Sequence, residues 1–318
     1  MKYLKISFLC LAVLAMIICA CNRDEIFERE QYKHIVSLVS NKSEGIFNIF
    51  EEELDLSLDP SIGYIAASCG GAHAITEPVT IRLAEDLDLL YEYNYANFEM
   101  REDLYVKSLS QNRYSVNALQ ITIPAHERSG KMQIRVNAKE LSPDSTYLIP
   151  FRITQTNCEI NPDNVTLFYR VFLKNFYATN RSNVEYAHAG ELTTGDGQPQ
   201  VTSMTKRVFP LSGNAVRMFA GNQSFNASLI NNWSLRVEIA QDGRKVTISS
   251  WGDSPDRVQV TQIDDDEYYP NIFFVEDLGY ITYKTFLLCY EYREPFTGVV
   301  RVMKERLRLE YKPLLDKK

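Results

Sequence analysis

Apolar and polar residues alternate with a period of two along most of the chain after residue 34. In residues 147–153 (YLIPFRI), Tyr147, Ile149, Phe151 and Ile153 would share one face of a strand. Residues 165–173 are apolar or aromatic at nearly every position, which is typical of a strand covered on both faces. Turn signals such as Asp59-Pro60 and Gly70-Gly71 separate further expected strands, at 63–69, 79–83, 121–123 and 134–136. This spacing predicts a β-sandwich of about seven or eight strands.

Residues 86–98 do not follow this period of two. Leu87, Leu90, Tyr91, Asn94 and Phe98 follow helical spacing, and Asp86 stands where a helix N-cap is expected. We expect one short helix that packs across an end of the sandwich.

The composition changes near Asn175, because residues 178–200 are rich in Asn, Thr, Ser and Gly. We therefore predict one domain at 34–177 and a second at 178–318. Period two then returns at 235–239, 246–248, 258–260, 286–292 and 305–311. The second domain is predicted to be an antiparallel β-barrel or sandwich. Strands do not alternate with helical patterns of about 10–15 residues, so neither a (β/α)₈ barrel nor a Rossmann domain is expected.

The first residues carry a secretion signal. Lys2 and Lys5 precede an apolar run at 6–18, which is too short to cross about 30 Å of hydrocarbon. The sequence ICAC at 18–21 fits a lipobox, so we predict a signal peptide at 1–20, acylation of Cys21 and a polar tether at 21–33. An ordinary cleaved signal peptide is the alternative. The acidic residues directly after Cys21 resemble the export signal of surface-exposed Bacteroidetes lipoproteins, which implies an outer-membrane protein that faces the cell exterior.

Composition excludes some classes of protein. Hydrophobic residues make up 45% and aromatic residues 12%, which is enough for real cores. Removal of residues 1–20 takes two lysines and no acid, which leaves 32 basic and 41 acidic residues and a net charge of −9. Without a basic patch, nucleic acid is not expected as a partner. Cys69, Cys158 and Cys289 remain besides Cys21; they allow one disulfide but are expected as small apolar side chains within strands.

Catalytic and cofactor motifs are missing from the sequence. It has no GxSxG, HExxH, P-loop or GxGxxG, and its four histidines are scattered. We therefore predict neither an enzyme nor a cofactor or metal. The acidic run at 264–267 could offer oxygen ligands to Ca²⁺, but it lacks the spacing of an EF-hand loop, and a solvated loop is the simpler interpretation.

Aromatic residues near two turns of the second half are the best candidates for binding. A sugar ring can stack its C–H groups on an exposed aromatic ring while nearby polar groups bond its hydroxyls. The candidate glycan-binding residues are Trp251, Asp253, Tyr268, Tyr269 and Asn271. The alternative is that these rings cover the end of a barrel core.

Several stretches resemble a known family. Residues 113–116, 119–125, 129–136 and 147–153 are similar to an N-terminal domain of unknown function in Bacteroidetes lipoproteins, whose relatives also precede a glycosidase domain in some endo-β-N-acetylglucosaminidases. In place of the family's usual glycine, this chain has His126-Glu127 after the sequence IPA. Residues 283–293 and 305–309 are similar to the matching C-terminal domain. The resemblance implies an immunoglobulin-like sandwich followed by a lipocalin-like or sandwich β domain, encoded beside outer-membrane import machinery in polysaccharide-utilization gene clusters.

Three functions are compatible with these features. The first is a lipid-anchored surface protein that binds a glycan without transforming it. The second is a structural or assembly lipoprotein of an outer-membrane import complex, and the third is a glycosidase or peptidase. The anchor, the two β domains and the resemblance favour the first.

Overall fold

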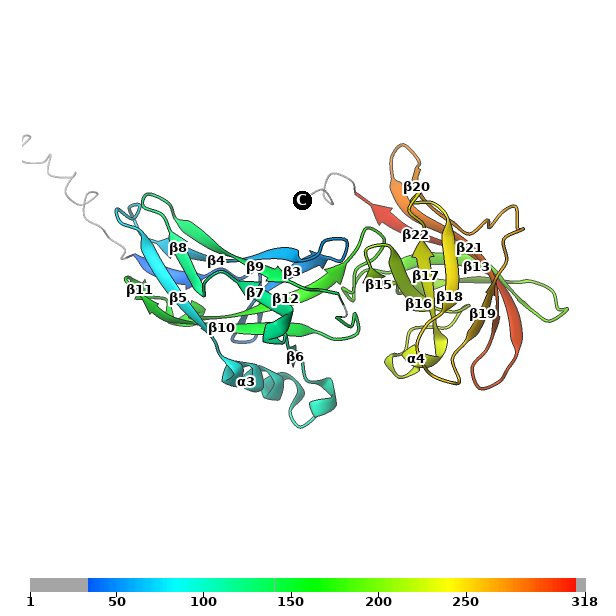
Figure 1. Ribbon diagram of the computed structural model, residues 1–318, viewed down its shortest axis with the longest axis horizontal. Helices are drawn as coiled ribbons and strands as arrows, with labels where there is room; N and C mark the ends of the chain where they lie inside the picture. Colours follow the sequence, from blue (N-terminus) through cyan, green and yellow to red (C-terminus); the bar gives the residue numbers. More distant parts are fainter. Residues whose placement is uncertain (1–33, 140, 313–318) are drawn as a thin grey trace, which may run out of the picture.

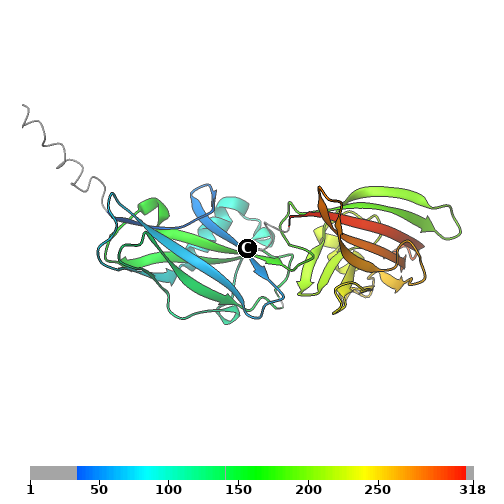
Figure 2. The same cartoon turned by 90° about the horizontal axis from the view of Figure 1, so that it is seen from above.

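The protein consists of two mostly β domains that lie end to end along its long axis (Figures 1 and 2). The computed structural model describes residues 34–139 and 141–312. The predicted signal peptide at 1–20, the predicted acylation site Cys21 and the predicted tether at 21–33 lie outside these residues. Within the described ranges, no helix is both long and apolar enough to span a membrane.

Two sheets pack face to face in the N-terminal domain, which confirms the predicted sandwich. The five-stranded sheet contains β1 (Ile35–Leu38), β4 (Ser61–Gly70), β7 (Tyr114–Val116), β9 (Ser129–Val136) and β11 (Glu159–Ile160). The seven-stranded sheet contains β2 (Lys42–Glu44), β3 (Phe47–Asp55), β5 (Val79–Glu85), β6 (Lys107–Ser108), β8 (Gln120–Ile123), β10 (Tyr147–Thr156) and β12 (Thr166–Lys174). Short 3₁₀ turns connect some of them: η1 (Glu102–Leu104), η2 (Gln111–Arg113) and η3 (Pro162–Asn164).

Helix α3 (Leu87–Phe98) covers the outer face of the seven-stranded sheet. Asp86 caps it as expected, because its carboxylate accepts the backbone N–H of Leu89 at 3.3 Å. Apolar side chains of the helix pack on Phe47, Ile49, Leu148 and Phe168. The helix is thus confirmed, but its expected place across an end of the sandwich is wrong. Strand β12 carries apolar side chains on both faces, and its outward Phe168 packs against Tyr93 of the helix, with ring centres 5.1 Å apart.

The C-terminal domain is antiparallel at each of its strand pairs. Its six-stranded sheet contains β13 (Tyr186–Thr194), β14 (Gln200–Lys206), β19 (Gln259–Gln262), β20 (Ile272–Asp277), β21 (Thr282–Arg293) and β22 (Val300–Tyr311). Its four-stranded sheet contains β15 (Phe209–Ser212), β16 (Ala215–Phe219), β17 (Ser234–Ile239) and β18 (Val246–Ser250), with η4 (Ala227–Leu229) and α4 (Ile230–Trp233) between β16 and β17. The two sheets share one core. They adjoin where Gln262 accepts the N–H of Ile248 at 2.7 Å, so the domain is a half-barrel.

Three cysteines lie in the part of the chain that the structure describes. Cys69 and Cys289 are buried within β4 and β21, as expected of small apolar side chains. Cys158 instead lies half-buried in the turn between β10 and β11.

Polar side chains join the two domains. Arg217 on β16 is fully buried and forms a bidentate ion pair with Asp144, in the loop before β10. Asn175, directly after β12, donates to the carbonyls of Ser212 and Ala215 at 2.7 and 3.0 Å. Because a buried polar group without a partner costs about 1–3 kcal/mol, these contacts favour one fixed docking of the domains.

Candidate functional site

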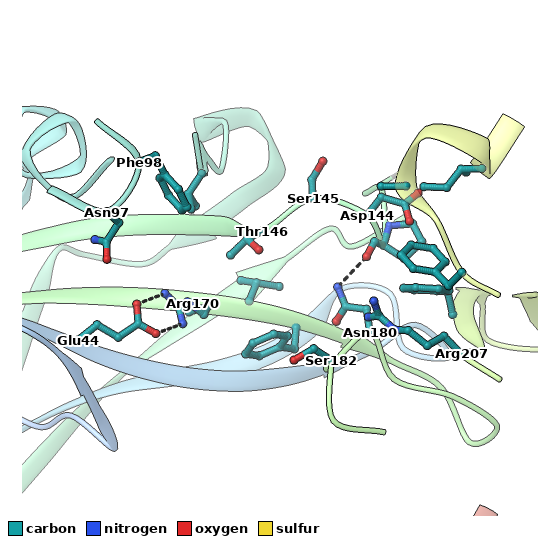
Figure 3. Close-up of a pocket in the computed structure, with 18 of the residues that line it drawn as sticks. Glu44, Asn97, Phe98, Asp144, Ser145, Thr146, Arg170, Asn180, Ser182 and Arg207 are labelled. Carbon is teal, nitrogen blue, oxygen red and sulfur yellow. Dashed lines mark hydrogen bonds and ion pairs between the residues drawn. The ribbon is translucent and has the colours of Figure 1, made fainter. Parts of the chain in front are cut away.

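A groove of about 630 Å³ lies where the domains meet (Figure 3). Strands β2 and β12, helix α3 and the loop before β10 form its N-terminal wall. Strand β15 and residues 225–230 form its C-terminal wall, and Asn180 and Ser182 of the connecting segment lie between the walls. Side chains from both domains are therefore needed to build it.

Five ionic and polar residues, called here the groove network, line or support the N-terminal wall: Lys42, Glu44, Glu51, Tyr93 and Arg170. Arg170 donates to both carboxylate oxygens of Glu44 at 2.8 and 2.9 Å, as Figure 3 shows, and to Glu51 at 3.0 Å. The parallel pairing of β3 with β12 places Glu51 directly opposite Arg170. Tyr93, from α3, donates to Glu44 at 2.5 Å, and Lys42 lies 2.8 Å from the same carboxylate.

The groove network sets the charge of its own members. The hydrogen bonds from Arg170 hold the pKa of Glu44 well below its usual range. Burial, together with the bond to Glu44, raises the pKa of Tyr93 to about 12. At neutral pH Glu44 is therefore ionised and Tyr93 carries its proton.

Aromatic rings and Arg207 line the C-terminal wall. The guanidinium of Arg207 lies 4.6 Å from the ring centre of Phe209 and 4.8 Å from that of Phe225. The guanidinium of buried Arg217 lies 4.7 Å from the centre of the same Phe209 ring. Asp144 is already engaged by Arg217.

The groove combines ring faces with small polar groups. Phe98 and Phe225 supply half-buried rings, and Asn97, Thr146 and Ser182 supply amide and hydroxyl groups on the same lining. This is the mixture that holds a polar ligand with apolar C–H faces, such as a sugar. Glu44 does not suit acid catalysis of glycoside hydrolysis, because a general acid needs a raised carboxyl pKa and that of Glu44 is lowered.

The sequence-predicted residues Trp251 and Asp253 lie outside this groove. They follow β18 and line a separate open hollow of about 540 Å³, together with Asn231 and Asn232. The Trp251 ring also lies 4.9 Å from the guanidinium of Arg217, so it contributes to the packing around this buried arginine.

Tyr268 and Tyr269 line a third hollow of about 300 Å³. Tyr268 is 78% exposed, as a stacking platform would require. Asn271 is buried, and its amide donates to the carbonyl of Ile263 at 2.6 Å and accepts the N–H of Cys289 at 2.8 Å. The amide thus anchors the loop before β20. The structure does not bring the five predicted residues together.

Two residues of the acidic run at 264–267, Asp264 and Asp266, already bond to other groups of the protein. Asp266 accepts the N–H groups of Tyr268 and Tyr269 at 3.0 and 2.9 Å and lies 2.5 Å from Lys304. In the part of the chain that the structure describes, no His, Cys, Asp and Glu side chains cluster in a way that could hold a metal ion.

Sequence reasoning missed the groove residues. Phe98, Arg170, Arg207 and Phe225 come from four distant segments, and none belongs to a motif. The only local signal is the polar segment at 178–200, which the composition marks as a connection between domains and which supplies Asn180 and Ser182.

Two family models match adjacent parts of the chain. One describes an N-terminal domain and matches residues 32–160, and the other describes a C-terminal domain and matches residues 165–308. None of the curated proteins matches the sequence.

Several solved structures share this two-domain fold. A protein of unknown function from Bacteroides ovatus is 15% identical, with 87% of this chain and 94% of that chain covered and a TM-score of 0.62. A multidomain protein from the same species, which includes a domain of unknown function, is 13% identical over 86% and 94%, with a TM-score of 0.61. An auxiliary nutrient binding protein from Bacteroides thetaiotaomicron is 18% identical over 82% and 90%, with a TM-score of 0.60.

Proposed function

The chain belongs to the family of two-domain Bacteroidetes β proteins that these N-terminal and C-terminal domains define, and from this membership we propose that it is a non-catalytic glycan-binding protein of the cell surface. In this proposal acylated Cys21 anchors the chain in the outer membrane, the tether at 21–33 spaces it from the lipid, and the two domains present a glycan to import proteins. One relative of the same fold is named an auxiliary nutrient binding protein, which supports such a role.

The observation that carries the proposal is the groove between the domains. It is built from ring faces, hydroxyls and amides, and its wall is held rigid by the ion pairs of the groove network. A wall that is already ordered loses little freedom when a ligand binds, which favours affinity. The chemistry that it offers suits binding better than proton transfer.

The test is calorimetric titration of residues 22–318, which lack the anchor, with a panel of plant and host oligosaccharides. Ser182→Trp places a large ring in the groove from an exposed position. We expect it to weaken glycan binding about tenfold or more, while the same change at exposed Ser203 on β14 leaves binding unaltered. Retained affinity in Ser182→Trp would refute the groove.

The aromatic hollows of the C-terminal domain are a second candidate for the same ligand, favoured by the exposed ring of Tyr268. Tyr268→Ala is the cleaner probe, because Trp251→Ala also removes a contact to buried Arg217. If Tyr268→Ala abolishes binding and Ser182→Trp does not, the site lies on the half-barrel. If no glycan binds and the chain co-purifies with import proteins, the role is assembly instead.

A further inference from the structure

The two ends of the groove differ in how their charges are balanced. At the N-terminal wall, Arg170 and Lys42 each face the carboxylates of Glu44 and Glu51, at 2.8 to 3.1 Å. At the other end of the groove, Asp144 forms a bidentate ion pair with Arg217. Arg207 therefore stands apart, because among residues 34–139 and 141–312 it has no ion-pair partner.

Arg207 is held in place although it is unpaired. Its guanidinium lies against the rings of Phe209 and Phe225, and these two rings contact each other at 5.0 Å between centres. The side chain is half-buried and lines the groove, as Figure 3 shows. Burial lowers the pKa of Arg207, yet an arginine stays charged at any physiological pH. The groove thus presents one fixed positive charge that no carboxylate of the described residues meets at ion-pair distance, although Glu185 and Asp144 lie near enough to favour that charge.

We propose that the groove takes an acidic glycan and that Arg207 binds a carboxylate on one of its sugars. A planar guanidinium can donate two parallel hydrogen bonds to a carboxylate, which makes the contact specific in geometry as well as in charge. Ser182 and Ser145 lie on the same lining and offer hydroxyls to the sugar, whereas the Asn180 amide already accepts the N–H of Leu173 and donates to the carbonyl of Pro143. The inference rests on the proposed glycan-binding function and names the class of sugar for that same site.

The charge of the whole chain makes non-specific attraction a poor explanation for such binding. The sequence has 41 acidic and 34 basic residues, a net charge of −7, so a polyanion is repelled at long range. Affinity for an acidic glycan would therefore report a local site.

The test compares matched probes on the chain without its anchor. Oligogalacturonate and hyaluronan hexasaccharide carry carboxylates, methyl-esterified oligogalacturonate keeps the backbone but loses the charge, and a keratan sulfate oligosaccharide carries sulfate alone. We expect a carboxylate probe to bind at least about tenfold more tightly than the neutral ester. Arg207→Gln should remove this difference, Arg207→Lys should restore part of it, and Arg82→Gln, an exposed arginine outside the groove, should leave it intact.

Each outcome decides the inference. Equal affinity for the ester and the free acid, or unchanged discrimination in a folded Arg207→Gln variant, overturns the role of Arg207 while leaving glycan binding standing. Binding of the sulfated probe alone overturns the carboxylate assignment. If Arg207→Gln loses thermal stability, the affinities of Arg207→Lys for the free acid and the ester decide instead, because lysine keeps the charge but not the planar guanidinium. A preference for the free acid that is as large as that of the unaltered protein would then overturn the role of the guanidinium. Failure of every probe, acidic and neutral, together with every other glycan of the panel, overturns the proposed function itself.

Discussion

Each domain carries a network of charged and polar side chains, and the two networks differ in their access to water. The groove network borders solvent, since the side chains of Lys42 and Glu44 are 43% and 25% exposed. In the half-barrel, His188, Lys206, Glu305 and Tyr290, called here the core network, are almost completely buried. The single carboxylate of Glu305 accepts from Lys206 at 2.6 Å and from Tyr290 at 2.7 Å, and it lies 3.1 Å from His188.

The comparison shows that similar charged groups can have different roles: buried in the half-barrel they stabilise the core, and at the groove they form a wall that water can reach. Burial opposes the charge on Lys206 and on Glu305, and each member of the pair offsets part of that penalty for the other. The core network therefore tolerates no missing partner and has no opening to a ligand. In the groove network two carboxylates share the three donor residues Lys42, Tyr93 and Arg170, Glu51 also accepts from Arg181 at 3.0 Å, and water can replace a lost bond. Such a wall can lie beside a binding site without endangering the fold.

The largest expected effect is in the core network. Glu305→Gln leaves Lys206 charged and unpaired in the interior, and we expect it to lower the free energy of unfolding by about 3–5 kcal/mol. Urea denaturation followed by circular dichroism measures the loss. The double variant Glu305→Gln with Lys206→Met removes the stranded charge and should recover part of the stability. A decrease of less than about 1 kcal/mol in the free energy of unfolding of the single variant would show that water reaches the core network.

An intermediate effect is expected at Glu44. Glu44→Gln weakens the bonds to Arg170, and we expect a loss of about 1–2 kcal/mol at pH 7, because one quarter of the side chain reaches water and screens the pair. The folded pKa of Glu44 is lowered, so its contribution is complete above the unfolded pKa of about 4.3 and shrinks as the pH falls below it. Denaturation of both proteins at pH 7 and pH 3 should show the difference narrowing. A difference that does not depend on pH would contradict the ion pair.

The smallest effect is expected at Lys42. Its ammonium lies 2.8 and 3.1 Å from Glu44 and Glu51, but the side chain is 43% exposed. Exposed pairs contribute about 0–1 kcal/mol, so Lys42→Met should change the free energy of unfolding by no more than about 0.5 kcal/mol, and less in 1 M salt. A loss comparable to that of Glu44→Gln would mean that the groove network acts as one unit. Double-variant cycles between the two positions would then measure their coupling.

Local pattern was sufficient for the elements whose apolar residues repeat regularly. The strands β4, β10, β12, β21 and β22 and the capped helix α3 lie where the spacing of apolar residues predicts them. The reason is that one strand face or helix stripe must be buried, and that requirement is written in consecutive residues. The hairpin β13–β14 was not predicted from the apolar pattern. Its inward positions include His188 and Gly190 rather than large apolar residues.

Two details of the backbone also could not be predicted from the local pattern of apolar residues. A glycine such as Gly190 is usually taken as a sign of a loop. Here a Cβ at this position would lie 2.3 Å from the carbonyl oxygen of Lys304 on the neighbouring strand, so the close pairing with β22 requires glycine. At the turn where the family usually has glycine, His126 adopts a φ of 67°, which keeps the left-handed turn with an unusual residue. Only the neighbouring strand shows why position 190 requires glycine.

The sequence by itself determined the all-β class, the helix and the burial of the cysteines in β4 and β21, since each follows from the burial of nearby residues. The tertiary structure alone decided the groove, because Arg170 and Glu44 are 126 positions apart and meet through the register of three strands. It also decided that Arg207 stands unpaired among the described residues, which depends on how Arg217 and Asp144 join the domains. Charge balance at a site is a property of which side chains come within reach, and no single segment carries that information.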